Sequence, residues 1–376
     1  MDFDFTPDTL MLRDMLRRFI QKDVRPLEMK YFTAGGLEPD ESARLRRAIE
    51  QMGLWGVTVP EEHGGGGLDL VTTCLLEIEL GNSFVPLEIG EVPNLLYACS
   101  GDQVSRYLEP ALAGERRAIL ALREPGAVHP QSWSLRAEPG NDGGQEGYLL
   151  NGQKLVGSRP HPEDFFLVVA SSPQGFTAFI AEPVEGRLTC QAGKREAGEL
   201  TLLFKNYPAH KEALLGQPGQ ALQLVVPTAS RVRIQTGARY VGIVERLLEM
   251  AVEHAKDWLS FGAPISLRPA VQRMLAETQA ELESARWLVY KAAWLVDLGR
   301  EELARRAAAY VRLITGRLLQ AAVERVTLIF AGPGSAEQIE PGRLVYSTIS
   351  PAGLELALEK TLAEIASELL DLRPNP

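Results

Sequence analysis

The sequence predicts a mainly helical protein with a β-domain in the middle of its 376 residues. Apolar residues recur at helical spacing before residue 116 and again from residue 219 to the end of the chain. Between these parts, short β-favouring runs are separated by Gly, Pro, Asn and Asp, as in a sandwich or a barrel. We therefore expect an N-terminal helical domain over residues 1–116, a β-domain over 117–218 and a C-terminal helical bundle over 219–376.

The N-terminal part is expected to be helical up to the β-domain. In its first helix, Leu16, Phe19 and Ile20 lie near helical spacing, with basic residues between them. The predicted helices cover residues 6–24, 40–52, 70–80 and 93–112. Four consecutive glycines at 64–67 suggest a phosphate loop, but no strand precedes them and no Lys-Ser/Thr pair follows. We interpret this segment as a connection between helices.

The remaining segments predict the strands and the C-terminal bundle. The strands are expected over residues 133–137, 148–156, 165–170, 176–181, 188–190 and 200–204. The run rich in Pro and Gly at 139–144 is interpreted as a turn, and no strand is expected after residue 225. Long helices are predicted over residues 221–259, 269–298, 301–330 and 351–370. Antiparallel helices of this length, joined by short loops, form a bundle.

The composition excludes several classes of function. The net charge of −10 repels nucleic acid and anionic membrane surfaces, so neither is expected as a partner. Charged residues interrupt every apolar run well before the ~20 residues that a membrane-spanning helix requires. The acidic start has no signal-peptide pattern, and the three cysteines and five histidines lack the spacing of metal ligands. We expect a cytoplasmic protein without a metal site.

Six blocks of the sequence resemble the acyl-CoA dehydrogenase family. They are residues 54–69 (LWGVTVPEEHGGGGLD), 107–115 (YLEPALAGE), 121–125 (ALREP), 151–154 (NGQK), 242–262 and 280–297. Each block is a weak signal alone, but they occur in the family's order over nearly the whole chain. The resemblance implies a mainly α fold with a central β-barrel, placed between an N-terminal helical domain and a C-terminal four-helix bundle.

The resemblance also implies a reaction, the α,β-desaturation of an acyl-CoA thioester. In the family, a glutamate removes the α-proton while FAD takes the β-hydride. Counting forward from residue 343 and back from residue 368 assigns the position of this glutamate to Glu355. The family has Tyr and Gly on either side, where this chain has Leu354 and Leu356. The alternative, a solvated glutamate on the last helix, stays open.

The cofactor site that the resemblance implies is altered. Arg123 stands where the family has a threonine that bonds the flavin ring, and Ser158 keeps one hydroxyl of the flavin-facing strand. Arg123 and Arg268 can serve as phosphate or thioester anchors, although surface charge also explains them. The positions that have lost the family's anchoring residues are His129, Val156, Trp258, Pro269, Leu328, Ala331 and Ala357. Because every ~1.4 kcal/mol of lost contact costs tenfold in affinity, we expect the isolated chain to bind FAD weakly or not at all.

Three interpretations of the function stay open, since a fold alone does not choose among them. The first is a working FAD-dependent acyl-CoA dehydrogenase. The second is a cofactor-poor subunit of a heteromeric acyl-CoA dehydrogenase, in which a paralogous subunit completes the flavin sites. The third is a non-catalytic acyl-CoA-binding scaffold.

The resemblance further implies the partners of the chain. These are an acyl-CoA substrate, electron-transfer flavoprotein as an electron acceptor, and other subunits in a homo-oligomer or in a complex with a paralogous acyl-CoA dehydrogenase. The C-terminal bundle is expected to build the oligomer. Leu247, Leu248 and Met250 belong to a strongly apolar helix, which an interface and core packing explain equally well.

Overall fold

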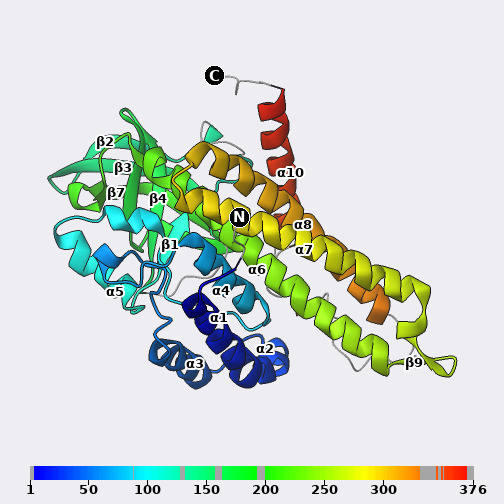
Figure 1. The fold of residues 1–376 in the computed structure, drawn as a ribbon. Helices are drawn as coiled ribbons and strands as arrows, with labels where there is room; N and C mark the ends of the chain where they lie inside the picture. The colour runs from blue at the N-terminus through cyan, green and yellow to red at the C-terminus, as the bar shows by residue number, and fades with distance from the viewer. Residues whose placement is uncertain are drawn as a thin grey trace. The chain divides into compact units, whose positions relative to one another are not determined.

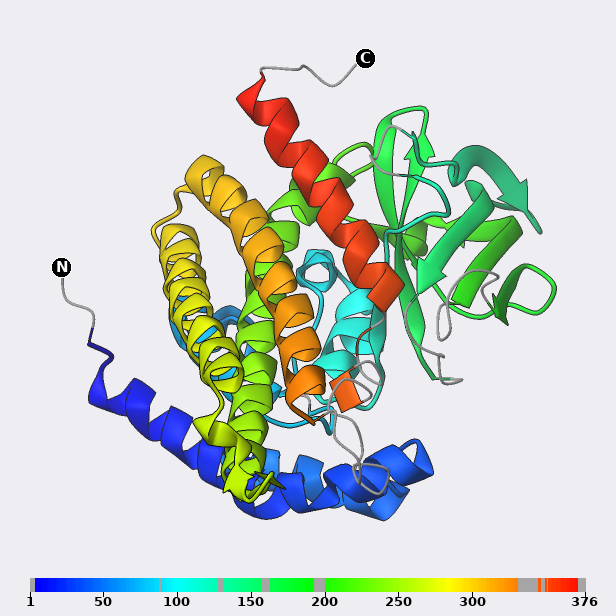
Figure 2. The same cartoon turned by 90° about the vertical axis from the view of Figure 1, so that its right-hand side faces the viewer.

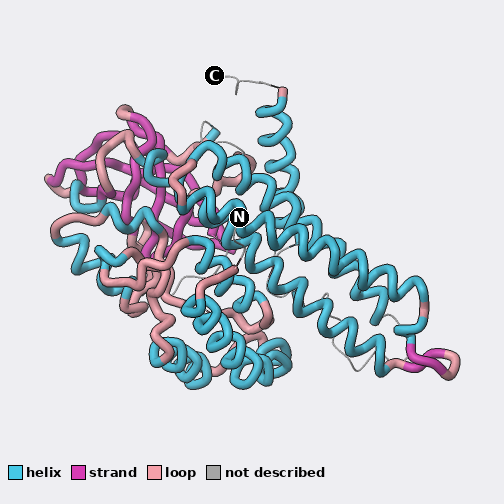
Figure 3. Tube along the Cα trace, viewed as in Figure 1, coloured by secondary structure: helices cyan, strands magenta, loops and turns pink. Residues whose placement is uncertain are grey.

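The computed structural model describes residues 4–87, 89–127, 132–156, 163–192, 200–330, 344–345, 349 and 351–370 (Figure 1). The chain divides into two compact units. A helical unit comprises Met1–Thr58, Gly67–Ile89 and Ser230–Pro376, and a sheet unit comprises Val59–Gly66 and Gly90–Ala229. Apart from one short hairpin, the strands belong to the sheet unit (Figure 3).

The N-terminal part of the helical unit contains α1 (Pro7–Phe19), α2 (Glu28–Ala34), α3 (Pro39–Gln51) and α4 (Leu70–Gly81). α1 begins at Thr6, whose Oγ1 accepts a hydrogen bond from the backbone N of Thr9 at 3.2 Å, and a proline follows at the first helical position. The helices predicted at residues 6–24, 40–52 and 70–80 are therefore confirmed, with the first ending in a π-helical turn over Ile20–Val24.

The C-terminal part contains the long helices α6 (Ala221–Asp257), α7 (Pro269–Asp297) and α8 (Glu301–Phe330), followed by α10 (Pro351–Leu369). α6, α7 and α8 lie side by side in both views, and α10 packs against α8 (Figures 1 and 2). From Ser230 onward, α6 shares one apolar core with α4, α7, α8 and α10. In this core Leu247 is 0% and Leu248 is 9% exposed, and Met250 packs against them. Core packing therefore accounts for the three residues that an interface also explained.

Two aspartates accept hydrogen bonds from the backbone N–H groups in the first turn of α4. The carboxylate of Asp69 accepts a hydrogen bond from the backbone N of Thr72 at 2.6 Å. Asp297, the last residue of α7, accepts hydrogen bonds from the backbone N of Leu70 at 2.8 Å and of Val71 at 3.1 Å. These N–H groups have no partner within the helix. The beginning of α4 is thus tied to the end of α7.

A two-residue hairpin connects α6 to α7, formed by β9 (Leu259–Ser260) and β10 (Ala263–Pro264). The prediction that no strand follows residue 225 is therefore wrong. Phe261 and Gly262 have φ angles of 54° and 81°. Both are left-handed, as a tight two-residue hairpin turn requires. The helices predicted on either side of it are present.

The sheet unit contains one sheet of eight strands. They are β1 (Ala118–Ala121), β2 (Arg136–Asp142), β3 (Gln145–Val156), β4 (Phe165–Ser172), β5 (Gly175–Ala181), β6 (Leu188–Ala192), β7 (Leu200–His210) and β8 (Leu214–Leu215). The path is β6-β7-β3-β2-β4-β5-β8, and β1 pairs in parallel with β4. Among the described residues β6 and β8 do not pair with each other, so the predicted closed barrel is not found. β8 spans two residues and pairs with β5 alone, which leaves no ladder to carry the sheet round to β6.

The strand predicted at residues 133–137 lies later in the chain, as β2. The run from Pro139 to Asp142, interpreted from the sequence as a turn, is strand, and Pro139 stands opposite Tyr148. The chain turns only at Gly143 and Gly144, whose φ angles are 59° and 93°. Pro and Gly usually interrupt a strand, but here Pro139 and Gly140 lie within β2, which continues up to the glycine turn of the hairpin. The short strands β1 and β8 were not predicted.

The helix predicted over residues 93–112 is broken. The structure has a 3₁₀ turn over Asn94–Ala98, a π-helical turn over Val104–Leu108 and the short α5 (Glu109–Leu112). Gly101 lies between the first two pieces with a φ of 55°. A residue in this left-handed conformation cannot continue a right-handed helix, so the helical pattern of the apolar residues is interrupted there.

α4 and α6 cross in direct backbone contact. A Cβ on Gly242 would lie 1.9 Å from the carbonyl O of Ile78, and one on Gly81 would lie 2.3 Å from the carbonyl O of Arg239. Only glycine permits backbones to approach so closely. Beside the crossing, the Arg239 Nε lies 2.7 Å from an oxygen of Glu77. The two helices are therefore held together at this crossing by close backbone packing and by an ion pair.

The first prediction concerns this crossing. Gly242→Ala is expected to lower the free energy of unfolding by about 1–3 kcal/mol, the usual cost of overpacking, because the new methyl group meets backbone and not a movable side chain. Gly36→Ala is the matched control, since nothing lies within 4 Å of a Cβ there. Urea unfolding measures both variants. Equal midpoints for Gly242→Ala and the unmodified protein would contradict the role given to this contact.

Candidate functional site

The sheet has a break between β1 and β2, on one side of β4. β1 pairs with the Phe165–Val168 half of β4, and β2 begins beside Ser171 of the same strand. Between β1 and β2 the chain leaves the sheet. β3 runs on past the start of β2, and its Leu155 N donates to the carbonyl O of Arg123 at 2.8 Å. Arg123 therefore lies beside the end of β3, where the resemblance places flavin contacts.

The buried carboxylate of Glu124 bridges this break by accepting hydrogen bonds from the residues before β2. One oxygen of its carboxylate accepts hydrogen bonds from the backbone N of Ser134 and from the Ser134 hydroxyl, the latter at 2.9 Å. The other accepts from the backbone N of Leu135 at 3.1 Å. These donors precede β2, so they lack the ladder partners that a continuous strand would give them. Burial alone would raise the pKa of Glu124, but the hydrogen bonds from Ser134 and the charge of Lys154 outweigh it and hold the pKa below its ordinary value.

Lys154 is the cation that balances Glu124. Its side chain is 0% exposed, and its Nζ lies 2.9 Å from the Glu124 carboxylate. The same Nζ donates to the carbonyl O of Leu122 at 3.2 Å and lies 4.1 Å from the centre of the Trp133 ring. The ammonium is thus held by a carboxylate, a carbonyl and an aromatic face.

The predicted residues of the sheet unit have different surroundings. The Arg123 side chain is exposed, whereas Val156, which stands at the tryptophan position of the resemblance, is 4% exposed and belongs to the apolar core of the sheet unit. Ser158 and His129 lie outside the described residues. No role for Glu124 or Lys154 was predicted. The signal was present, because each lies in a block that resembles the family, but only the fold shows that the two blocks meet.

Glu355 lies in the first turns of α10, in the helical unit. Leu354 and Leu358 are 5% and 6% exposed and belong to the core shared with α8. Glu355 itself is exposed. α10 is also tied to its neighbours by charge, since Glu364 lies 3.0 Å from Arg233 of α6. The position of Glu355 on the helix is therefore well supported, while its carboxylate stays accessible.

Arg268 lies at the other end of the long helices, directly before α7. Its Nη2 donates to the carbonyl O of Ser260 at 3.0 Å, and its guanidinium lies 5.6 Å from the centre of the Phe261 ring. The hairpin that holds these contacts is drawn away from α10 in both views (Figures 1 and 2). Arg268 and Glu355 are therefore not brought together within the helical unit.

Trp258, which stands at the position of the family's pyrophosphate arginine, belongs to a stack of rings. His254 lies between Trp258, with ring centres 5.5 Å apart, and Phe330, with ring centres 4.1 Å apart. Both ring pairs are nearly parallel. Burial lowers the pKa of His254. At the end of α6 the chain thus has an apolar stack in place of a cation.

The other altered positions in the helical unit also lack polar side chains. Leu328 is 59% exposed, Pro269 is exposed and has no N–H to donate, and Ala357 is half-buried. Ala331 lies outside the described residues. Of the described positions that the resemblance assigns to FAD, Arg123 and Arg268 are charged and exposed, and arginine suits an anionic phosphate. The other described positions have apolar or aromatic side chains, which offer few donors to the cofactor.

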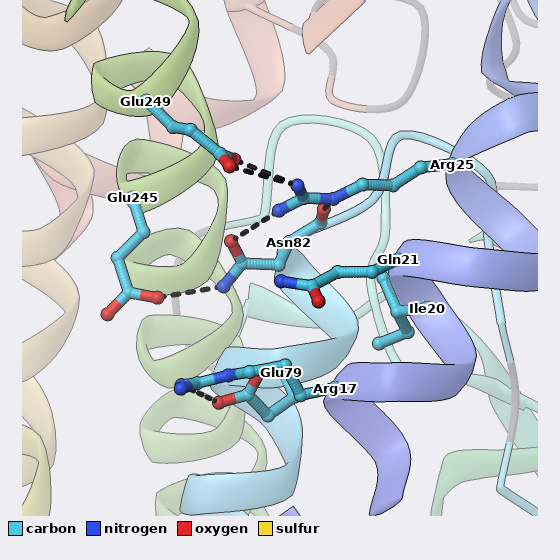
Figure 4. Close-up of a pocket in the computed structure, with 8 residues that line it drawn as sticks. All are labelled: Arg17, Ile20, Gln21, Arg25, Glu79, Asn82, Glu245 and Glu249. Atoms are coloured by element: carbon cyan, nitrogen blue, oxygen red, sulfur yellow. Dashed lines mark hydrogen bonds and ion pairs between the residues drawn. The ribbon is translucent and has the colours of Figure 1, made fainter. Parts of the chain in front are cut away.

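A polar pocket of about 200 Å³ lies in the helical unit, between α1, α4 and α6 (Figure 4). Its charged groups are paired. Arg17 makes two hydrogen bonds to Glu79, at 2.6 and 3.0 Å, and Arg25 lies 2.9 Å from Glu249. The Nδ2 of Asn82 donates to Glu245 at 2.7 Å. Because each of these groups has a protein partner, the pocket joins helices and has no free charge to bind a ligand.

Two other features are absent from the part of the chain that the structure describes. No group of three or more His, Cys, Asp or Glu side chains there is arranged to hold a metal ion. No helix there is both long enough and apolar enough to cross a membrane.

Comparisons with known proteins agree with this arrangement. Residues 6–115 match the acyl-CoA dehydrogenase N-terminal domain, and residues 222–349 match the acyl-CoA dehydrogenase C-terminal domain. Among curated proteins, the chain is 28% identical over 370 residues to (R)-benzylsuccinyl-CoA dehydrogenase of Thauera aromatica, covering 90% of this chain and 89% of that protein.

Solved structures share the fold. Butyryl-CoA dehydrogenase from Megasphaera elsdenii has a TM-score of 0.81 at 23% identity, covering 98% of this chain and 100% of that one. An acyl-CoA dehydrogenase from Bacillus anthracis, solved with FAD, also has a TM-score of 0.81 at 23% identity, covering 98% of this chain and 69% of that one. With both terminal domains matched and the fold shared along nearly its whole length, the chain belongs to the acyl-CoA dehydrogenase family.

Proposed function

We propose that this chain is an acyl-CoA dehydrogenase-like flavoprotein, which uses FAD in the α,β-desaturation of an acyl-CoA thioester. The observation that carries the proposal is the match to both terminal domains of the family, which together cover more than half of the chain. The similar proteins from T. aromatica and M. elsdenii are named as dehydrogenases of benzylsuccinyl-CoA and butyryl-CoA. The acyl group in this chain's own substrate is not assigned.

The cofactor contacts proposed for this chain come from three residues. Arg123 and Arg268 have exposed guanidinium groups that suit an anionic phosphate, and Ser158 would add a hydroxyl. When bound, FAD supplies the acceptor for the hydride that leaves the β-carbon. The contribution of the chain is to bind and orient the reactants and to move the proton.

Glu355 is the proposed base. Its carboxylate would take the proton from the α-carbon of the thioester, which becomes more acidic when its carbonyl accepts hydrogen bonds. The exposed position of Glu355 leaves it open to a ligand. A bound acyl chain or a neighbouring subunit would then exclude water from the carboxylate.

A second candidate function is that of a subunit in a heteromeric acyl-CoA dehydrogenase. It is supported by the ring stack of Trp258, His254 and Phe330, because the resemblance assigns position 258 to an arginine that meets the pyrophosphate. In such a complex a paralogous subunit supplies the missing anchors, and electron-transfer flavoprotein remains the proposed acceptor. A non-catalytic acyl-CoA-binding scaffold is the outcome if neither arrangement is active.

We also propose that the chain assembles through α7 and α8. Each helix has large apolar side chains on one face, separated by intervals of 4, 7 or 14 residues. The members of these two stripes are 42–59% exposed: Trp287 and Trp294 on α7 with Leu298 at its C-terminal cap, and Leu303, Tyr310, Ile314 and Leu328 on α8. Exposed apolar surface of this extent is typical of a protein contact.

The finer architecture is part of the same proposal. We infer that α6, α7, α8 and α10 form a four-helix bundle, which is supported by the packing of α7 and α10 on α8 and by the common core. The functional domains are proposed as residues 1–116, 117–218 and 219–376, which separate the segments rich in strands from those rich in helices.

The second prediction tests the base. Glu355→Gln should lower the rate of acyl-CoA-dependent dye reduction by at least ~10², the low end for general-base catalysis. The matched control is Glu359→Gln, which changes an exposed glutamate one turn further along α10. The assay is run with a panel of acyl-CoAs, with added FAD and with any co-purifying subunit. An unchanged rate for Glu355→Gln would move the proton transfer to another residue.

The third prediction tests the lost cation. Trp258→Arg should tighten FAD binding by about tenfold or more, since a hydrogen bond to a charged group contributes ~1.5–3 kcal/mol. Trp258→Leu is the control for loss of the ring stack alone. FAD affinity is measured by fluorescence titration. Stoichiometric FAD that survives dialysis of the unmodified chain would contradict the weak site and remove the support for the heteromer.

The fourth prediction tests the contact face. Trp287→Glu combined with Trp294→Glu should convert the oligomer to a monomer, because two charges would have to be buried in an apolar contact. Met11→Glu is the control, since Met11 is also exposed, at 63%, but lies on α1. Sedimentation velocity measures all three proteins. An unmodified chain that is monomeric at micromolar concentration would refute the proposed assembly.

A further inference from the structure

We propose that Lys154 and Glu124 are positioning residues, whose buried ion pair holds Arg123 in place beside the end of β3. The proposal rests on the proposed function only in the ligand that Arg123 is expected to contact. The placement of Arg123 itself follows from contacts within the sheet unit.

Lys154 binds the residues on both sides of Arg123. Its Nζ donates to the carbonyl O of Leu122 at 3.2 Å and lies 2.9 Å from the carboxylate of Glu124. The backbone of Arg123 is fixed as well, since its carbonyl O accepts from Leu155 N at 2.8 Å. The carbonyl O of Leu122, the carbonyl O of Arg123 and the side chain of Glu124 are therefore all bound, so the backbone of Arg123 is held on both sides, and the residue is exposed.

The ion pair is buried, in a position where apolar side chains would also be compatible with the fold. Its side chains are 0% and 1% exposed. Lys154 also contacts Leu122 and Trp133, which pack against an apolar core of the same sheet unit. Taking two charges out of water is costly, and apolar replacements of buried ion pairs are often neutral or even stabilising. An ion pair differs from an apolar cluster because its hydrogen bonds are directional, so the groups that it binds must keep one orientation. Here the backbone of residues 122–124 is the segment whose orientation is fixed.

The ring of Trp133 also contacts the ion pair. Its centre lies 4.1 Å from the Lys154 Nζ, and the ring also meets Phe176 edge-on, with centres 5.5 Å apart. Trp133 belongs to the segment that returns to β2, and the backbone N–H groups of the two residues after it are bound by Glu124. One ion pair therefore holds the chain where it leaves the sheet and where it returns.

The test removes the charges but keeps a neutral acceptor. In the variant E124Q/K154M the single amide oxygen of glutamine can accept from Ser134 or from Leu135 but not from both, and the donor to Leu122 is gone. In E124Q/K154Q an amide donor is restored. Because E124Q is present in both double variants, the difference between them reports the donor at position 154. The matched control is Asp164→Asn at the other end of β1, where Arg117 lies 2.7 Å from Asp164, which is 4% exposed.

The first readout is amide hydrogen exchange of the protein without ligand. E124Q/K154M should speed exchange in peptides covering residues 120–127 and 150–156 by about tenfold, as expected when a hydrogen bond to a charged group is lost. Exchange elsewhere in the sheet should stay unchanged, and E124Q/K154Q should restore part of the protection. Asp164→Asn should leave both peptides as they are. If E124Q/K154M does not fold, E124Q/K154Q is compared with the unmodified chain, and loss of the charged donor is then expected to speed exchange in the same two peptides by less than tenfold.

The second readout is FAD affinity, measured with and without Arg123→Ala. If the pair acts through Arg123, E124Q/K154M weakens FAD binding and adding Arg123→Ala causes no further loss. Additive losses would overturn the positioning role, and so would unchanged exchange in the two peptides. If the unmodified chain binds no FAD and reduces no dye, the proposed function fails, while the exchange measurement still decides on the ion pair.

Discussion

The buried ion pair between Lys154 and Glu124 is the contact on which the middle of the sheet depends. Where β1 ends and β2 begins beside β4, backbone N–H groups lack partners in the ladder. Each buried N–H group without a hydrogen-bond partner lowers the stability of the fold. Glu124 accepts from Ser134 and Leu135, and Lys154 balances its charge. The break between β1 and β2 can therefore lie inside a folded sheet. The chain that leaves the sheet there can present an exposed cation, Arg123, on a fixed backbone.

The helical unit is held together by close backbone packing, whereas the break in the sheet unit is held by a charged pair. The backbones of α4 and α6 touch at Gly81 and Gly242, so no side chain separates them. Around this crossing, ion pairs such as Arg17–Glu79 join the N-terminal helices to the rest, and Asp297 binds the start of α4 from the end of α7. Such a unit places α10 firmly against α8, while Glu355 on its outer side remains accessible.

The departures from the family's pattern follow one physical trend. Trp258 stacks with His254 within the chain, Val156 is buried in the sheet core, and Leu328 is an exposed apolar residue. At these positions, the side chains that the resemblance assigns to cofactor binding are replaced by apolar or aromatic ones. Among the described positions, the charged residues proposed for FAD are the exposed Arg123 and Arg268, and arginine suits phosphates better than a flavin ring. Both observations support the proposal of a flavoprotein that shares its site with another subunit.

The sequence by itself determined the family, the order of helical and strand-rich parts and the position of Glu355 on the last helix, because apolar periodicity and short motifs are local properties of the chain. It misplaced β2, joined the pieces of residues 93–112 into one helix and missed the β9–β10 hairpin, because glycine and proline act differently in a turn and in a ladder. Only the tertiary structure decided that Leu247 is core and that Lys154 meets Glu124. Those outcomes depend on contacts between residues far apart in the chain, and no local pattern of residue types contains them.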